Sequence, residues 1–216
     1  MNRPARVAGV VLAAGTGSRM NRAKQLLPFR GKTILECVVD TALASSLSQV
    51  VVILGHQARS ILSLLQGRDL KTVINYDYED GQSTSLKAGL QALTPDTEAV
   101  LFLLGDQPLI SPELIDAILA VYHRSPAPIV IPVFAGVRGN PALFARQTFP
   151  KIAELTGDCG ARAIFAEYAD QILETPVSDR AIHLDIDTEE DYQNLLRLET
   201  QVSSTLTINS GSDIPR

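Results

Sequence analysis

The sequence is poor in the residues that build disulfide or zinc frameworks, with two cysteines and three histidines among 216 residues. Cys37 lies in an apolar run and Cys159 in "GDCGAR", and this separation fits neither a zinc-ligand cluster nor a disulfide framework. No histidine is close to Cys159 in the sequence, so we expect a small buried thiol rather than a catalytic nucleophile. This cysteine usage favours a reducing compartment.

A basic excess is also missing, because the formal net charge is −5. A protein that follows a nucleic-acid backbone needs the opposite balance, so we expect no nucleic-acid partner and a small, locally bound phosphate ligand at most. The N-terminal apolar run is interrupted by glycine and Arg19 too early for a membrane span, and a signal peptide would consume the first strand of a regular pattern. We therefore expect a cytoplasmic protein without a membrane partner.

Apolar strands and amphipathic helices alternate along most of the chain. The apolar runs that predict strands lie at 7–14, 49–55, 71–76, 98–104 and 128–134. Runs with helical spacing lie at 33–45, 58–67, 83–93, 111–123 and in two stretches from 145 to 169. An extended segment at 171–177, a short strand at 181–187 and a helix at 188–202 complete the pattern. It predicts one α/β domain over residues 1–202, with a doubly wound and mostly parallel sheet, and a flexible C-terminal tail at 203–216.

The stretch after the first strand combines glycine with basic residues. Gly15 and Gly17 permit backbone conformations in which amide N–H groups turn toward an anion, and Arg19 and Lys24 add positive charge. Such a loop suits phosphate, although a strand-to-helix turn with solvated charges is the alternative. Arg19 can bind phosphate oxygens bidentately, whereas Lys24 acts as a mobile point charge.

Two carboxylates are expected at the ends of strands. Asp106 follows the strand at 98–104 after one glycine, and Asp187 ends the short strand expected before the last helix. Ligands of open α/β sheets bind at the carboxyl ends of strands, and two carboxylates with a triphosphate complete an oxygen shell that suits Mg²⁺. The structural alternatives are helix caps, with Asp106 before the helix that starts after Ser111 and Asp187 in a capping box with Glu190.

Several motifs together resemble one known family. They are "LAAGTGSRM", "KQLLPF", "GQSTSLKAGL", "GDQP", "RGNPALF", "GDCGAR" and "DIDTEEDY". In this order, from residue 7 to about 198, they resemble the molybdopterin nucleotidyltransferases, and within that family most closely the molybdenum cofactor cytidylyltransferases. The resemblance implies a Rossmann-like nucleotidyltransferase fold of the nucleotide-diphospho-sugar transferase type. It also implies transfer of CMP from CTP to molybdenum-bearing molybdopterin, which gives the cytosine dinucleotide cofactor and pyrophosphate.

The resemblance also implies roles for individual residues. Nucleotide binding is implied for Leu12, Ala13, Ala14, Gly15, Gly17, Arg19, Lys24, Gly81, Gln82, Ser83 and Ser85. Contact with the pterin substrate is implied for Arg138, Gly139, Asn140, Asp158 and Arg162. Arg19, Lys24 and Asp106 would be catalytic, and Asp106 and Asp187 would hold Mg²⁺. A recipient molybdoenzyme or its maturation chaperone is the implied protein partner, and Asn21 stands where relatives commonly have glycine.

Other functions remain open at this point. A guanylyltransferase or a sugar- or lipid-phosphate nucleotidyltransferase would share the fold, although a sugar enzyme would not need "RGNP" and "GDCGAR". A chaperone that delivers the finished cofactor without catalysis is a third reading. Ala14 bears on base choice, because guanine-using relatives typically carry glycine there and a methyl group favours a one-ring base.

Overall fold

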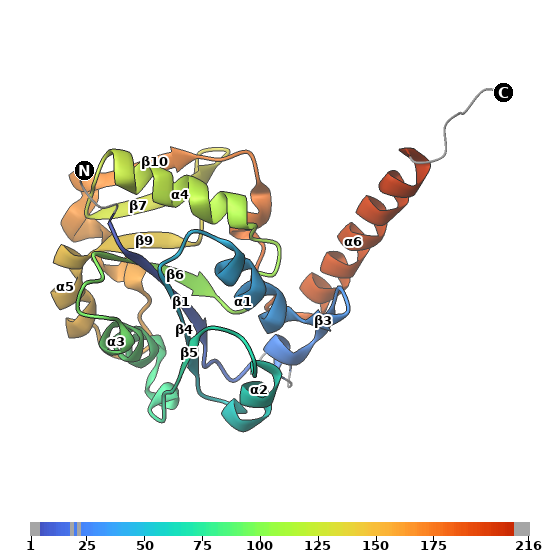
Figure 1. Cartoon of the computed structure of the whole chain (residues 1–216), viewed down its shortest axis with the longest axis horizontal. Coiled ribbons are helices and arrows are strands. Elements are labelled where there is room, and N and C mark those ends of the chain that lie inside the picture. Colours follow the sequence, from blue (N-terminus) through green and yellow to red (C-terminus); the bar gives the residue numbers. More distant parts are fainter. Residues whose placement is uncertain (1–4, 18–19, 21–22, 210–216) are drawn as a thin grey trace.

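The computed structural model describes residues 5–17, 20 and 23–209, and these residues form an α/β domain around one large sheet (Figure 1). The eight strands of this sheet are β1 (Val7–Ala13), β4 (Gln49–Leu54), β5 (Lys71–Ile74), β6 (Ala99–Leu104), β7 (Ile129–Phe134), β8 (Val137–Arg138), β9 (Ala142–Ala145) and β10 (Ile172–Pro176). A separate hairpin consists of β2 (Pro28–Phe29) and β3 (Lys32–Thr33).

The strand order is β10-β7-β9-β6-β1-β4-β5, and β8 pairs with β7. The strands β6, β1, β4 and β5 run parallel to one another, and β10 runs parallel to β7, which confirms the predicted mostly parallel sheet. Strand β9 runs antiparallel between β6 and β7. The sequence pattern does not predict β9, because its four residues are all buried and show no alternation.

Helices cover both faces of the sheet, as a doubly wound fold requires. On one face lie α1 (Ile34–Ala44), α2 (Ala58–Leu64) and α4 (Pro112–Arg124). On the other lie α3 (Gln82–Ala92), α5 (Phe149–Glu154) and the 3-10 segment η5 (Ala161–Gln171). The second helical run expected before residue 169 is therefore a 3-10 segment, and it is interrupted at Tyr168, whose φ and ψ are −117° and 17°.

The C-terminal region differs from the prediction in two ways. The strand expected at 181–187 is wrong: Arg180–His183 form the 3-10 turn η6, which starts where the Asp179 carboxylate accepts a hydrogen bond from the Ala181 amide at 2.8 Å. Helix α6 (Glu189–Asn209) continues past residue 202, because the first helix-breaking glycine after it is Gly211. Residues 203–209 of the expected flexible tail are thus helical, and 210–216 lie outside the described residues.

The start of α6 is attached to the β2–β3 hairpin. Tyr192 and Leu195 pack against Phe29 and the buried Ile186, and the Tyr192 hydroxyl donates to the Pro28 carbonyl at 2.7 Å. Beyond this contact α6 extends away from the sheet (Figure 1). Among the described residues, no helix combines the length and apolar character needed to cross a lipid bilayer.

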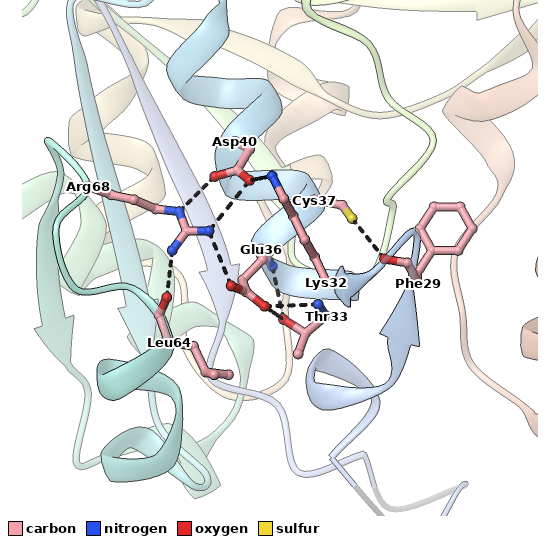
Figure 2. A network of polar contacts seen from close by, with 8 residues as sticks. All are labelled: Phe29, Lys32, Thr33, Glu36, Cys37, Asp40, Leu64 and Arg68. Carbon is pink, nitrogen blue, oxygen red and sulfur yellow. Dashed lines mark hydrogen bonds and ion pairs between the residues drawn. The ribbon is translucent and has the colours of Figure 1, made fainter.

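A polar network joins α1 to the segment after α2 (Figure 2). The Arg68 guanidinium donates to Asp40 Oδ1 at 2.7 Å, to Glu36 Oε1 at 3.2 Å and to the Leu64 carbonyl. Glu36 also forms a capping box with Thr33 at the start of α1. Burial alone would raise the pKa of both carboxyls, but hydrogen bonds from Thr33 and Arg68 to Glu36, and from Arg68 to Asp40, hold their pKa values below the usual range.

We expect Arg68→Ala to destabilise the fold by about 1 to 2 kcal/mol near neutral pH, because it removes the cation from the partly buried Glu36 and leaves Asp40 with Lys32 alone. Lowered pKa values stabilise the fold above the unfolded pKa of about 4, and this contribution is lost as the pH falls through the folded values. The difference from the unmodified protein should therefore shrink between about pH 7 and about pH 3 in urea unfolding. The exposed Arg59 on α2 gives the control, and an equal loss for Arg59→Ala would contradict this role for the network.

Candidate active site

Lys24, Asp106 and Asp187 meet at one edge of the sheet. Lys24 begins the 3-10 turn η2 (Lys24–Leu26), and its side chain is 15% exposed. Its Nζ forms an ion pair with Asp106 Oδ2 and lies 2.8 Å from Asp187 Oδ1. The reading of Lys24 as a solvated loop charge is therefore wrong, and three residues from separate motifs form one cluster.

The topology explains why these groups meet. Strands β1 and β6 are parallel neighbours, so the loop after β1 and the residues after β6 emerge at the same edge. Lys24 belongs to the first segment and Asp106 to the second. Asp187 arrives from far along the chain, because the buried Ile186 donates its amide to the Asp106 carbonyl at 3.1 Å.

The capping box at the start of α6 uses other residues than expected. Asp191 Oδ2 accepts from the Thr188 amide at 2.8 Å, and the Asp191 amide donates to the Thr188 hydroxyl at 3.2 Å. The predicted pair of Asp187 and Glu190 is one residue out of register and is wrong. The Asp187 carboxylate instead faces Lys24.

Burial and neighbouring charges have opposing effects on the pKa values of Asp106 and Lys24. Burial raises the pKa of the Asp106 carboxyl, Lys24 opposes this rise, and the nearby Asp185 and Asp187 add to it. Burial would lower the pKa of Lys24, but its two carboxylate partners raise that pKa above its usual value. An additional cation would therefore stabilise the ionised Asp106.

The donor set at this edge fits a hard divalent cation. Asp106 Oδ1 is buried and has no hydrogen-bond partner among the described residues, which is costly for a carboxylate oxygen unless a ligand reaches it. No set of three or more histidine, cysteine, aspartate or glutamate residues within 5–17, 20 and 23–209 could hold a metal. Two carboxylates suffice for Mg²⁺, which usually takes few protein ligands and completes its shell with water and phosphate oxygens.

A pocket of about 500 Å³ opens beside this cluster. It is lined by Leu12, Ala14, Gly15, Thr16, Lys24, Gln25, Tyr78, Glu79, Asp80, Gly81, Gln82, Ser85, Leu104, Gly105, Asp106 and Asp158. We call this pocket the nucleotide pocket. Seven of the residues predicted to bind nucleotide are in its wall: Leu12, Ala14, Gly15, Lys24, Gly81, Gln82 and Ser85.

Other predicted nucleotide residues lie elsewhere. Ala13 and Ser83 are each 1% exposed and are absent from the lining, as is Gly17, whose φ is +63°. Helical spacing explains Ser83, because Gln82 and Ser85 are three residues apart on the pocket side of α3 and Ser83 points into the core. Arg19 and Asn21 lie outside the described residues.

Some lining residues have no assigned role in the sequence analysis. Tyr78 and its two neighbours come from the 3-10 turn η3 (Tyr78–Asp80), which directly precedes "GQS". The Tyr78 ring packs on Gly55, where a Cβ atom would lie 2.7 Å from Tyr78 Cγ. Gln25 is 4% exposed, and its Nε2 donates to the Gly15 carbonyl at 3.3 Å. In the sequence, the only indication that Gln25 belongs to the site is its position directly after Lys24.

A second pocket of about 390 Å³ adjoins the first. Its wall consists of Leu12, Gln82, Leu86, Phe102, Leu104, Asn140, Ala142, Phe144, Cys159, Gly160, Ala161, Arg162 and Ala163. We call it the acceptor-side pocket, and it shares Leu12, Gln82 and Leu104 with the nucleotide pocket. Cys159 is exposed here, so the expected burial of this thiol is wrong.

The residues predicted to face the pterin are divided between three places. Asn140 and Arg162 line the acceptor-side pocket, where Arg162 Nη2 donates to Asn140 Oδ1 at 3.1 Å. Burial lowers the pKa of Arg162, and Asp185 opposes this effect. Arg138 is outside both pockets and donates to Glu174 Oε1 at 2.7 Å, because β8 directs it toward β10.

Gly139 and Asp158 also lie away from the acceptor-side pocket. A Cβ atom at Gly139 would be 2.5 Å from the Ile182 side chain, so this glycine permits close packing. Asp158 lies in the wall of the nucleotide pocket. The structure therefore places Asn140 and Arg162 in the wall of the acceptor-side pocket and Arg138, Gly139 and Asp158 outside that wall.

A mostly parallel sheet with a glycine loop after β1, Asp106 after the adjacent strand β6 and Asp187 beside it is typical of a nucleotidyltransferase-type α/β fold. Residues 9–172 match the model of the MobA-like NTP transferase domain, and the chain belongs to this nucleotidyltransferase family.

Relatives of similar length are known. The chain is 32% identical over 199 residues to nicotine blue oxidoreductase of Paenarthrobacter nicotinovorans, covering 88% of this chain and 96% of the relative. It is 31% identical over 201 residues to the purine catabolism protein PucB of Bacillus subtilis, covering 88% and 95%. The crystal structure of Rv0371c from Mycobacterium tuberculosis has 31% identity and a TM-score of 0.82 over 91% of this chain and all of that one. A complex of Rv0371c with manganese has 30% identity and a TM-score of 0.78, covering 89% and 98%.

Proposed function

We propose that this protein transfers CMP from CTP to molybdopterin, with Mg²⁺ as its cation, and releases pyrophosphate. The observation that carries the proposal is that Lys24 and Asp106 lie together in the wall of the nucleotide pocket, where Lys24 forms ion pairs with Asp106 and with Asp187. The low cysteine content described above favours a cytoplasmic location, and a molybdoenzyme or its chaperone would receive the product.

The nucleotide pocket has the groups that a triphosphate requires. The glycine loop at 14–16 lines the pocket beside Gln82 and Ser85 of α3, and Lys24 supplies a mobile charge. A cation held by Asp106 and Asp187 would neutralise phosphate charge and polarise a phosphoryl oxygen. The manganese complex of the mycobacterial relative supports a divalent cation at this fold.

Group transfer then needs positioning more than proton transfer. A terminal phosphate oxygen of the pterin attacks the α-phosphorus in line, one P–O bond forms, and the bond to the β-phosphate oxygen breaks. Pyrophosphate leaves with the electron pair of that bond. Lys24 Nζ stabilises the charge that develops on the transferring group, while the pocket wall holds the base and ribose.

The acceptor-side pocket suits a flat ring that carries a phosphate. Leu86, Phe102 and Phe144 supply an apolar wall, while Asn140 and Arg162 supply polar groups. An amide and a guanidinium can bind the polar edge of a pterin or an anionic group. Because this pocket shares Gln82 with the nucleotide pocket, an acceptor there is adjacent to the nucleotide.

The direct test measures pyrophosphate release from each of the four nucleoside triphosphates, with Mg²⁺ or Mn²⁺, and with or without a molybdopterin acceptor. We expect release with CTP only when the acceptor is present. Release with a sugar phosphate would favour a sugar nucleotidyltransferase, and binding of the cofactor without release would favour a delivery chaperone. The name of the nicotine blue relative denotes a redox activity, so reduction of that dye without nucleotidyl transfer would also overturn the proposal.

The choice between cytosine and guanine can be tested at Ala14, which is 5% exposed and lies in the pocket wall. A single steric contact discriminates by ~1 to 3 kcal/mol, so we expect catalytic efficiency with CTP to exceed that with GTP roughly ten- to a hundredfold. Ala14→Gly should narrow this ratio without reversing it. The matched control is Ala13→Gly, since Ala13 is buried outside the pocket wall and should affect stability but not the ratio. Equal efficiencies with CTP and GTP in the unmodified protein would contradict the cytidylyl assignment.

A further inference from the structure

The first turn of α3 is capped by a segment more than seventy residues away. Gly81 precedes the helix and has no side chain to cap it. The Gln82 amide instead donates to Asp158 Oδ1 at 3.3 Å, and the Ser83 amide donates to the Gly157 carbonyl at 3.3 Å. Two of the amides that a helix leaves unpaired at its start are therefore paired by the "GDCG" segment.

The two segments are also in direct backbone contact. Gly81 has φ of +109°, and a Cβ atom there would lie 2.3 Å from the Gly157 carbonyl carbon and 2.4 Å from the Asp158 nitrogen. On the other side of the loop, a Cβ atom at Gly160 would be 2.8 Å from Gln82 Oε1. No side chain fits between the segments, so a shift of one requires a shift of the other.

This contact lies where the two pockets meet. Asp158 lines the nucleotide pocket together with Gly81 and Gln82. The next residues of the same loop, from Cys159 to Arg162, line the acceptor-side pocket. The loop at 157–160 thus belongs to both walls, but the Asp158 carboxylate is on the nucleotide side.

We infer that Asp158 is a positioning residue for the nucleotide pocket, which it supports by capping the first turn of α3. This inference rests on the proposed function in one respect, since it takes the first pocket as the nucleotide site. It replaces the pterin contact that the family resemblance implies for Asp158. Without the Asp158 carboxylate, the Gln82 amide loses its partner while the Ser83 amide keeps the Gly157 carbonyl, so the wall formed by Gly81 and Gln82 is held less firmly in place.

The charge of Asp158 must be separated from its hydrogen bond, because a carboxylate near a triphosphate also repels it. Asp158→Asn removes the charge and keeps an oxygen that can accept from the Gln82 amide, whereas Asp158→Ala removes both. We expect the Ala variant to bind CTP about five- to tenfold more weakly than the Asn variant, as the loss of a helix cap predicts. The measurement is calorimetric binding of CTP with Mg²⁺ in the absence of acceptor, followed by the KM of each substrate. The acceptor KM should change less than about twofold, because the Asp158 carboxylate is outside the acceptor-side pocket.

A control variant separates this role from a purely structural one. Asp116 Oδ1 accepts a hydrogen bond from the Ser46 amide at 2.7 Å, and Asp116 lines neither pocket. Asp116→Ala should lower the melting temperature without affecting CTP binding. Asp158→Ser keeps a hydroxyl able to cap a helix, so it should bind CTP more tightly than Asp158→Ala. If the Ala variant folds poorly, the Ser variant is compared with Asp158→Asn instead.

Three results would overturn the inference. Equal CTP affinities of the Ala and Asn variants would show that the cap does not support the pocket. A raised acceptor KM with unchanged CTP affinity would place Asp158 in contact with the acceptor. Failure of the unmodified protein to bind any nucleoside triphosphate would overturn the proposed function itself, and with it this role for Asp158.

Discussion

Asp106→Asn is expected to lower kcat roughly a thousandfold while the protein stays folded, because it removes a carboxylate that would hold the divalent cation. The structural basis is the buried Asp106 Oδ1, which has no hydrogen-bond partner among the described residues, beside the Lys24 ion pair. Burial already raises the pKa of this carboxyl, so the fold loses little when its charge is removed. The measurement is steady-state pyrophosphate release over a range of Mg²⁺ and Mn²⁺ concentrations, with thermal unfolding of the same samples.

The control for Asp106→Asn is the same substitution at Asp116. That carboxylate is on α4 and outside the walls of both pockets. Asp116→Asn should leave kcat and its dependence on the cation unchanged. Near-normal turnover by a folded Asp106→Asn variant would exclude Asp106 from the mechanism, and the proposed cation site would be wrong.

Lys24→Ala is expected to lower kcat/KM about a hundredfold, because it removes a charge that stabilises the transferring phosphoryl group. It should also lower the melting temperature when no divalent cation is present. Asp106 and Asp187 would then face each other without Lys24, and the pKa of the buried Asp106 would rise further because Lys24 is the group that lowers it. Added Mg²⁺ or Mn²⁺ should restore much of this stability, since the cation would replace the lost charge. Thermal unfolding with and without the cation, together with steady-state kinetics, measures both effects.

Lys32→Ala is the matched control, since Lys32 also forms an ion pair with an aspartate, Asp40, but its side chain is 52% exposed and outside the nucleotide pocket. Its melting temperature should not respond to the divalent cation more than that of the unmodified protein. A large stability loss for Lys24→Ala with unchanged kinetics would mean that Lys24 serves the fold alone.

Much of the fold could be predicted because its signals are local. Buried parallel strands such as β6 are continuous apolar runs. The start of α4 is indicated by a serine cap followed by proline in the first turn. The exceptions have identifiable causes. Strand β9 is too short and too buried to alternate, and the apolar residues of "AIHLDID" pack inward from a 3-10 turn and an extended segment instead of a strand.

The candidate site was predictable to a similar degree. Lys24 and Asp106 follow strands whose carboxyl ends must share one edge if the strands are parallel neighbours, so their meeting follows from the pattern. The direction of a side chain after a loop does not. Arg138 turns to Glu174 because β8 folds back on β7, and no local feature of "VRGNP" indicates that contact.

The α/β class, the order of most elements and the chemistry available at the strand ends follow from the sequence alone. Hydrophobic period, caps and glycine positions are properties of neighbouring residues, and the unfolded chain already carries them. The contact of Asp187 with Lys24 and the capping of α3 by Asp158 are visible only in the folded protein. Both depend on contacts between segments more than seventy residues apart, such as the hydrogen bond from Ile186 to Asp106 and the approach of Gly157 to Gly81. Such contacts exist only after packing has brought the segments together, because a single hydrogen bond is too weak to overcome the entropy of closing so long a loop.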